Sequence, residues 1–248
     1  LRPQRRRQQR RMRVRAISVT QALPGAILDL PVGATPEMVI VYTARVSAPE
    51  NQTKHLTALR LLSFCMRHGH WSVFEMADLT MEIETSRAIA AQVLRHRSFS
   101  FQEFSQRYSA VTKLGELWEP VEMRATHVDG NRQGSGDNIG WVPIPHETYS
   151  VQEVTQAALG HAQQAYNELL SAGVAPECAR MVLPLATKTR IYMKGSVRSW
   201  IHYFKVRCDG HTQKEHRLLA EAIQIEFAKV FPIIAEAMAV VPEEPKVT

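Results

Sequence analysis

Residues Arg95 to Arg107 read RHRSFSFQEFSQR, an Arg-His-Arg group followed seven residues later by Ser-Gln-Arg. Guanidinium groups bind phosphate through paired hydrogen bonds, which favours arginine over lysine at such sites. Phe99, Phe101 and Phe104 favour burial or ring stacking, whereas a solvated charged face would mix glutamate with lysine. The stretch therefore predicts an anion site beside packed aromatic rings, and a basic surface loop is the plain alternative.

The residues before this stretch predict a strand and then a helix. Apolar and polar residues alternate from Phe74 to Glu84, as in a strand with one face in water. Ser86 can cap a following helix, on which Gln92 and Arg95 share a face. We expect the Arg-His-Arg group at the C-terminal end of this helix, running into the Phe-rich loop.

Strands and helices also alternate along the rest of the chain. Ser150 and Glu153 form a capping box for a helix that ends near Ala172, with Gly173 as its terminator. Periodicity indicates strands at residues 13–20 and 187–194, and helices at residues 37–47, 53–66, 196–206 and 212–239, with a short one from Pro176 and a break at Pro232. These patterns predict an α/β fold in one domain, without giving the strand order.

The segment at residues 125–145 is polar and rich in glycine, and it includes GSGDNIG. A glycine series can cradle a pyrophosphate when a strand precedes it and a helix follows. The flanking residues here are DGNRQ and WVPIP, so we interpret the segment as a mobile loop and not as a dinucleotide-binding motif.

The net charge of +6 arises from the first residues of the sequence. Residues 1–15 hold eight arginines and no acidic residue, so the remainder has a net charge of −2. This Arg-rich arm could bind nucleic acid or an anionic surface, or serve as a targeting peptide. A third interpretation, which we favour, is that translation starts at Met12 and residues 1–11 are a disordered or non-native arm before a domain at residues 12–248.

The cysteines and histidines suggest neither a disulfide framework nor a metal site. Cys65, Cys178 and Cys208 form no CxxC pair, and the histidines lack an HExxH spacing. We expect no bound metal, and a cytoplasmic location fits the cysteine usage best. Cys178 lies in a predicted helix where we expect burial, so we give it no nucleophilic role.

Three further segments place arginines where anions could bind. Arg180 lies next to an apolar run, Arg198 and His202 are four apart on a predicted helix, and Arg207 and His211 are four apart beyond it. Together with RHR-x7-S-x-R, these segments resemble the flavin-dependent thymidylate synthases over most of residues 13–240.

The resemblance implies a fold, a reaction and an assembly. The fold would be one α/β domain with a central mixed sheet packed by helices. FAD would carry a hydride from NADPH, and a one-carbon unit from 5,10-methylenetetrahydrofolate would pass to C5 of dUMP, giving dTMP. The enzyme would be a homotetramer whose sites are built from several subunits.

The resemblance also implies site residues by position. The dUMP site would use Gln92, Arg95, Glu103, Ser105, Gln106, Arg107, Arg180 and Arg207. The FAD site would use Ser72, Arg95, His96, Arg97, Ser196, Val197, Arg198 and His202, with His70 near the flavin ring. Ser196 and His202 depart from the asparagines found in other members, although both can still form hydrogen bonds.

The catalytic residue implied in this way is Arg207. A fixed cation against the pyrimidine stabilises the negative charge that develops when N3 ionises, which makes C5 more nucleophilic. Arginine suits this role because it keeps its charge and presents a planar fork.

Two other functions compete with this one. A nucleic-acid-binding module would use the arm and the Phe-Arg loop, but the net acidic remainder of the chain disfavours it. A flavoprotein of the same fold without synthase activity is the other alternative. The intact set of Ser105, Arg107, Arg180 and Arg207 argues against it.

Overall fold

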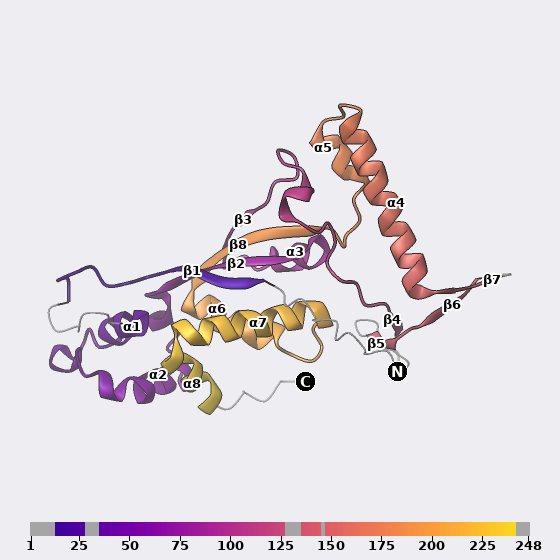
Figure 1. Cartoon of the computed structure of the whole chain (residues 1–248). Helices are drawn as coiled ribbons and strands as arrows, with labels where there is room; N and C mark the ends of the chain where they lie inside the picture. Colours follow the sequence, from indigo (N-terminus) through magenta and orange to yellow (C-terminus); the bar gives the residue numbers. More distant parts are fainter. Residues whose placement is uncertain (1–12, 28–34, 127–134, 145–146, 242–248) are drawn as a thin grey trace, which may run out of the picture.

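The computed structural model describes residues 13–27, 35–126, 135–144 and 147–241, and it is built around a four-stranded sheet (Figure 1). The strands are β1 (Val14–Val19), β2 (Asp78–Ser86), β8 (Lys188–Ser196) and β3 (Ser100–Glu103), side by side in the order β1-β2-β8-β3. Each neighbouring pair is antiparallel. The expectation of a mixed sheet is therefore wrong as to strand direction, while the helix-packed α/β architecture is confirmed.

Alternation along the strands separates an apolar face from a polar one. On β2, Leu79, Met81 and Ile83 are fully buried. On the opposite face, Glu82 accepts hydrogen bonds from Nε of Arg15 (2.9 Å) and from the hydroxyl of Tyr192 (3.0 Å). The polar residues of the predicted strands thus form ladders of charge across β1, β2 and β8.

Helices cover the apolar face. Figure 1 shows α6 and α7 running along the sheet, with α1, α2 and α8 gathered beyond one end. The main core is rich in buried aromatic rings, among them Trp200, Tyr203, Phe204 and Phe227. The helices span α1 (Pro36–Ala44), α2 (Ala58–Arg67), α3 (Arg87–Val93), α4 (Val151–Ser171), α5 (Pro176–Ala179), α6 (Val197–Arg207), α7 (Lys214–Val230) and α8 (Pro232–Val240).

Local signals in the sequence placed several of these boundaries correctly. The Ser150–Glu153 capping box begins α4, Gly173 follows it with φ +82°, and Pro232 opens α8. Ser86 caps α3 as expected, but the helix ends at Val93. The Arg-His-Arg group therefore lies in the turn beyond α3, and the Phe-rich loop that follows is the edge strand β3.

Two short hairpins lie in or beside the segment at residues 125–145, where the sequence predicted a mobile loop. β4 (Arg124–Thr126) pairs with β5 (Ser135–Asn138), and β6 (Trp141–Ile144) pairs with β7 (Glu147–Ser150). The loop interpretation is thus wrong for β4, β5 and β6, because such short strands cannot show the alternation that reveals longer ones. The expected arm, residues 1–11, lies outside the described residues.

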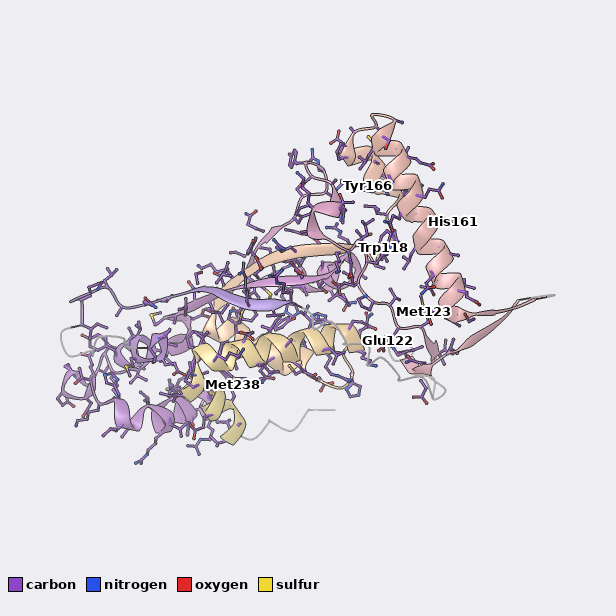
Figure 2. All side chains as sticks on the ribbon, in the orientation of Figure 1. Trp118, Glu122, Met123, His161, Tyr166 and Met238 are labelled. Carbon is purple, nitrogen blue, oxygen red and sulfur yellow. The ribbon has the colours of Figure 1, made fainter. Side chains whose placement is uncertain are left out.

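Helix α4 leads away from the sheet toward α5, and a second small core anchors it (Figure 1). Tyr166 on α4 is fully buried, packs with Leu117 and Ala179, and accepts a hydrogen bond from the backbone N–H of Val111 (3.4 Å). Figure 2 shows Tyr166 and Trp118 on the side of α4 that faces the sheet. This core holds α5, and with it the neighbourhood of Arg180, against α4, and Leu117 links it to β8 by accepting a hydrogen bond from the backbone N–H of Lys188 at 2.8 Å.

Gly195 lets the Phe99 ring lie directly against the backbone of β8. A Cβ on Gly195 would lie 2.5 Å from Cδ1 of Phe99, far closer than van der Waals contact. Phe99 in turn packs edge-on against Trp200, with ring centroids 4.7 Å apart. This contact fixes the turn that carries His96 against α6.

We predict that Gly195→Ala destabilises the chain by about 1–3 kcal/mol, because the ring of Phe99 must move to make room. The matched control is Gly160→Ala in α4, where an added Cβ meets nothing within 4 Å. That change should be neutral or stabilise by up to about 1 kcal/mol. Urea denaturation of both variants checks this; equal stability of the two would contradict the packing described.

Candidate active site

The turn after α3 and the end of α6 meet through Arg207 and His96. Arg207 is the last residue of α6, and its Nε donates a hydrogen bond to Nε2 of His96 at 2.9 Å. His96 also packs edge-on against the fully buried Tyr203, with ring centroids 4.9 Å apart. Only Nε of Arg207 takes part in the bond, so the two terminal nitrogens can serve a ligand.

This bond requires an uncharged histidine. A guanidinium N–H can only donate, so Nε2 of His96 must be bare and the ring proton must sit on Nδ1. Burial lowers the pKa of His96 to about 4, and the charges of Arg207 and His202 push the pKa in the same direction. Near neutral pH the pair is therefore a fixed cation held by a neutral ring.

A cavity of about 420 Å³ opens beside this pair, between the end of α6 and the start of α7. Gln92 lies at its margin, because its amide Nε2 donates to Oε1 of Gln213 at 2.6 Å. Arg95 and Arg97, on either side of His96, are exposed. The cavity is lined by Lys205, Val206, Arg207, Asp209, His211, Thr212 and Gln213.

A second cavity, of about 540 Å³, lies on the other side of Lys205. Arg198, His202 and Lys205 recur at helical spacing on α6 and so share one face. Arg198 Nη1 pairs with Oε1 of Glu75 at 3.0 Å, and the ammonium of Lys205 lies 4.9 Å from the centroid of the Trp71 ring. The lining comprises Trp71, Glu75, Ser98, Arg198, Ser199, Ile201, His202 and Lys205.

The short 3-10 helix η3 (Trp71–Glu75) contributes two of these residues and contains Ser72. His70 precedes η3, and its backbone N–H donates to the carbonyl of Cys65 at 2.8 Å. His70 also meets Phe64 edge-on at 5.8 Å between ring centroids. Both residues therefore lie in or next to the element that forms one wall of the second cavity.

Ser196 and Val197 have structural partners at the start of α6. The hydroxyl of Ser196 caps the helix by accepting from the backbone N–H of Ser199 at 3.3 Å. Val197 is fully buried, and its backbone N–H donates to the carbonyl of Ala77 at 2.9 Å. A ligand would meet these two residues mainly through backbone atoms.

A separate arginine cluster forms around Glu177 on α5. Nε of Arg107 lies 3.6 Å from Oε2 of Glu177, and Nε of Arg180 donates to the Glu177 backbone carbonyl at 3.2 Å. Arg180 begins the 3-10 helix η5 (Arg180–Val182). Ser105 opens a turn in which its carbonyl accepts from the N–H of Ser109.

Two other predicted residues lie next to this arginine cluster. Gln106 is only 6% exposed, and its amide nitrogen is buried with no hydrogen-bond partner in the structure. An unpaired buried amide costs free energy unless a ligand or an ordered water accepts its hydrogen bonds. Glu103 accepts from the hydroxyl of Thr189 at 2.8 Å and pairs with Arg87, so part of its carboxylate is already engaged.

The predicted residues thus form two groups on one chain. His96, Arg207 and Gln92 gather at the junction of α6 and α7, next to the Arg198–His202 face. Arg107 and Arg180 gather at α5, which Figure 1 shows at the far end of α4 and well apart from α6.

The sequence did not identify several residues that the structure adds to the site. Lys205 follows the helical spacing of Arg198 and His202, so that periodicity could have revealed it. Tyr203 and His216 lie in the core, and no local pattern marks them. The expected burial of Cys178 is wrong: it is exposed, because a helix as short as α5 covers little of its surface.

The described residues include no group of three or more His, Cys, Asp or Glu side chains placed to hold a metal ion. Within the same part of the chain, no helix combines the length and apolar character needed to cross a membrane.

Comparison with known proteins gives consistent matches. Residues 32–233 match the family model described as thymidylate synthase complementing protein. A flavin-dependent thymidylate synthase of Synechocystis is 51% identical over 228 residues, covering 92% of this chain and 99% of that protein. A probable flavin-dependent thymidylate synthase of Paramecium bursaria Chlorella virus 1 is 46% identical with the same coverage.

A solved structure shares the fold. The UMP/dUMP methylase PolB from Streptomyces cacaoi, bound with 5-Br dUMP, superposes with a TM-score of 0.71 at 25% sequence identity. The match covers 93% of this chain and 97% of that one.

We predict that acid weakens the fold through His96. The unfolded chain takes up a proton near pH 6.5, whereas the folded chain resists it until about pH 4. Stability should therefore be complete above pH 6.5 and fall as the pH drops toward 4. His96 should contribute less than about 1.4 kcal/mol per pH unit to the slope of the unfolding free energy against pH, because its ring is only partly buried.

The matched variant is His96→Gln, whose amide oxygen can still accept from Arg207 but cannot take a proton. Its urea midpoint should fall less steeply than that of the wild type between pH 6.5 and 4. Parallel pH profiles would contradict the proposed linkage.

Proposed function

The chain belongs to the flavin-dependent thymidylate synthase family, and from this premise we propose how its own residues divide the conversion of dUMP to dTMP. The observation that carries the proposal is the bond between Nε of Arg207 and Nε2 of His96. It fixes the guanidinium at one edge and leaves its terminal nitrogens out of the bond, and Arg207 lines a cavity large enough for a nucleotide base.

Arg207 acts on the pyrimidine in this proposal. The planar fork pairs with the ring as N3 loses its proton, and its charge stabilises the anion, which raises electron density at C5. The neutral His96 holds the fork in position without competing for the anion. Gln92, near the end of α3, and Arg95, in the turn that follows, bind the nucleotide beside it.

The cluster at α5 binds the phosphate of dUMP. Arg107 and Arg180 supply two guanidinium groups, and Ser105 a hydroxyl. Arg107 forms a surface ion pair with Glu177 in the structure. The dianionic phosphate of dUMP would replace Glu177 as the partner of Arg107, because such exposed pairs are weak. The buried, unpartnered amide nitrogen of Gln106 supports a ligand here, and Glu103 completes the set.

The second cavity suits FAD. Arg198, His202 and Lys205 offer positive or hydrogen-bonding groups for a pyrophosphate, and Trp71 an aromatic wall. We assign Ser72, His96, Arg97, Ser196 and Val197 to the same cofactor, with His70 toward the flavin ring. When bound, FAD would supply hydride transfer between NADPH and the one-carbon unit of 5,10-methylenetetrahydrofolate.

The separation of the two groups favours a homotetramer with shared sites. Figure 1 shows α5 at the far end of α4, apart from the end of α6 that carries Arg207, which supports a site built from two copies of the chain. A second copy that brings its α5 to the Arg207 group would complete the site. We further propose a cytoplasmic location, supported by three free cysteines, and a working domain at residues 12–248.

We predict that Arg207→Ala lowers kcat by about 100- to 1,000-fold, because a preorganised charge at the developing anion is lost. Bound flavin and the urea midpoint should stay close to wild type. Arg60→Ala, an exposed arginine on α2, is the control and should keep full activity. A folded, flavin-loaded Arg207→Ala enzyme with normal turnover would exclude the proposed role.

We also predict rescue between two inactive chains. Arg107→Ala and Arg207→Ala homotetramers should each be inactive, while mixed tetramers should recover up to about a quarter of wild-type activity, since some sites then receive both arginines. Arg207→Ala mixed with His96→Ala is the control, because these residues come from one chain and no site regains both. Mixed tetramers verified by mass and still inactive would rule out the shared site.

A further inference from the structure

A chain of hydrogen bonds runs from the surface at the start of α7 into the core behind Arg207. Its outer end is Glu215, whose two carboxylate oxygens accept from Arg124 at 2.6 and 3.0 Å. Burial pushes the pKa of Glu215 upward, but the hydrogen bonds from Arg124, the backbone and Gln213, with the charge of Arg124, hold it below its ordinary value. Glu215 is therefore ionised and can only accept hydrogen bonds.

The Glu215–Arg124 pair belongs to a wider ion network that ties α7 to β4. Arg124 also pairs with Glu122 at 3.1 Å, and Glu122 accepts from Lys214 at 2.7 Å. Figure 2 shows Glu122 at the tip of α7. Arg124, which holds the outer end of the hydrogen-bond chain, is thus itself held by Glu122.

The ionised Glu215 sets the direction of the bonds that follow. Gln213 must present its amide nitrogen to Glu215, and it does so at 2.9 Å. The carbonyl oxygen of Gln213 then accepts from Nε2 of Gln92 at 2.6 Å. This orients Gln92 with its own carbonyl oxygen toward the core.

His216 continues the chain inward. It is fully buried on α7, and its Nδ1 lies 3.1 Å from Oε1 of Gln92. An amide oxygen only accepts, so Nδ1 carries the ring proton. Burial, with the charges of Arg207 and His96, lowers the pKa of His216 to about 3, so the ring is neutral and Nε2 is bare.

Tyr203 closes the chain in the core. Its hydroxyl lies 3.1 Å from Nε2 of His216, and since that nitrogen is bare the hydroxyl must donate. Burial raises the pKa of Tyr203, which keeps its proton in place. Every group from Glu215 to Tyr203 therefore has a single orientation consistent with its neighbours.

Gln92 is the member of the chain that we assign to the nucleotide, and its partner Gln213 lines the cavity. Both polar atoms of its amide are held, and one N–H of the NH₂ group remains for a ligand. A glutamine side chain free in solvent would offer either end of its amide and would lose rotamer entropy on binding. Held as it is, Gln92 presents a donor only.

We propose that His216 is a positioning residue for nucleotide binding: it fixes the amide of Gln92 so that an N–H, and not the carbonyl, faces the acceptor groups of dUMP. This rests on the proposed function, because it takes Gln92 as a nucleotide ligand. His216 itself touches no substrate. A leucine or methionine would fill the same space in the core but would leave the carbonyl oxygen of Gln92 without its donor, so that Gln213 alone would hold the amide.

The test compares dUMP affinity and stability in FAD-loaded enzyme. His216→Phe keeps a ring but removes both nitrogens, and it should raise the Kd for dUMP by about five- to twentyfold with kcat nearly unchanged, because uniform binding is lost. His216→Gln can again donate and accept, and it should restore most of the affinity. Leu219→Ala, another fully buried position on α7, should lower the urea midpoint and leave the Kd unchanged.

A double-mutant cycle separates action through Gln92 from a general loosening of the core. Gln92→Ala alone should weaken dUMP binding, and His216→Phe added to it should cause no further loss. Additive losses, or a wild-type Kd for His216→Phe, would overturn the inference. A wild-type Kd for Gln92→Ala would instead refute the nucleotide-binding role of Gln92 in the proposed function.

A surface variant serves if His216→Phe does not fold. Glu215→Gln keeps the shape of the side chain at the outer end of the hydrogen-bond chain. It removes the negative charge that fixes which atom donates and which accepts in each bond. It should raise the Kd for dUMP by about two- to fivefold, although Glu215 lies outside the cavity lining. Unchanged affinity in this variant would overturn the inference in the same way.

Discussion

The site depends on one hydrogen bond between a cation and a ring that must stay neutral. Arg207 can only donate, so His96 can hold it only while Nε2 is bare. The protein secures this by partly burying His96 against Tyr203 and by surrounding it with the charges of Arg207 and His202, which lower its pKa to about 4. A charged His96 would repel the guanidinium that it now positions, and the cavity beside α6 would lose its fixed charge.

The sheet and its helices supply the rigidity that this bond needs. The turn with His96 follows α3, and Arg207 ends α6, so two elements far apart in sequence must meet to a fraction of an ångström. The ring of Phe99 sets that meeting, because it lies between the bare backbone of Gly195 and the Trp200 ring on α6. His216 adds a second constraint from α7 through Gln92. The turn that carries His96 is therefore held by α3, α6 and α7.

Local signals made much of the fold predictable from the sequence. Ser150 with Glu153, Gly173 and Pro232 act within a few residues, so their effects could be inferred without knowing the partners. The Arg-His-Arg motif likewise led to the correct family. Strand direction could not be inferred, since it depends on which strands pair, and the expected mixed sheet is antiparallel. The contact of His216 with Gln92 joins residues 124 positions apart and leaves no periodic trace. For the same reason the division of the arginines between α5 and α6 emerged only from the structure.

The most direct test of this account is the protonation state of His96, read by ¹⁵N NMR of histidine-labelled enzyme near neutral pH. We predict a neutral ring with its proton on Nδ1 and an unprotonated Nε2 in hydrogen-bonding contact with Arg207. His96→Gln would identify the signal by its loss. An imidazolium at neutral pH, or a neutral ring with its proton on Nε2, would show that His96 does not hold Arg207 and would contradict the account.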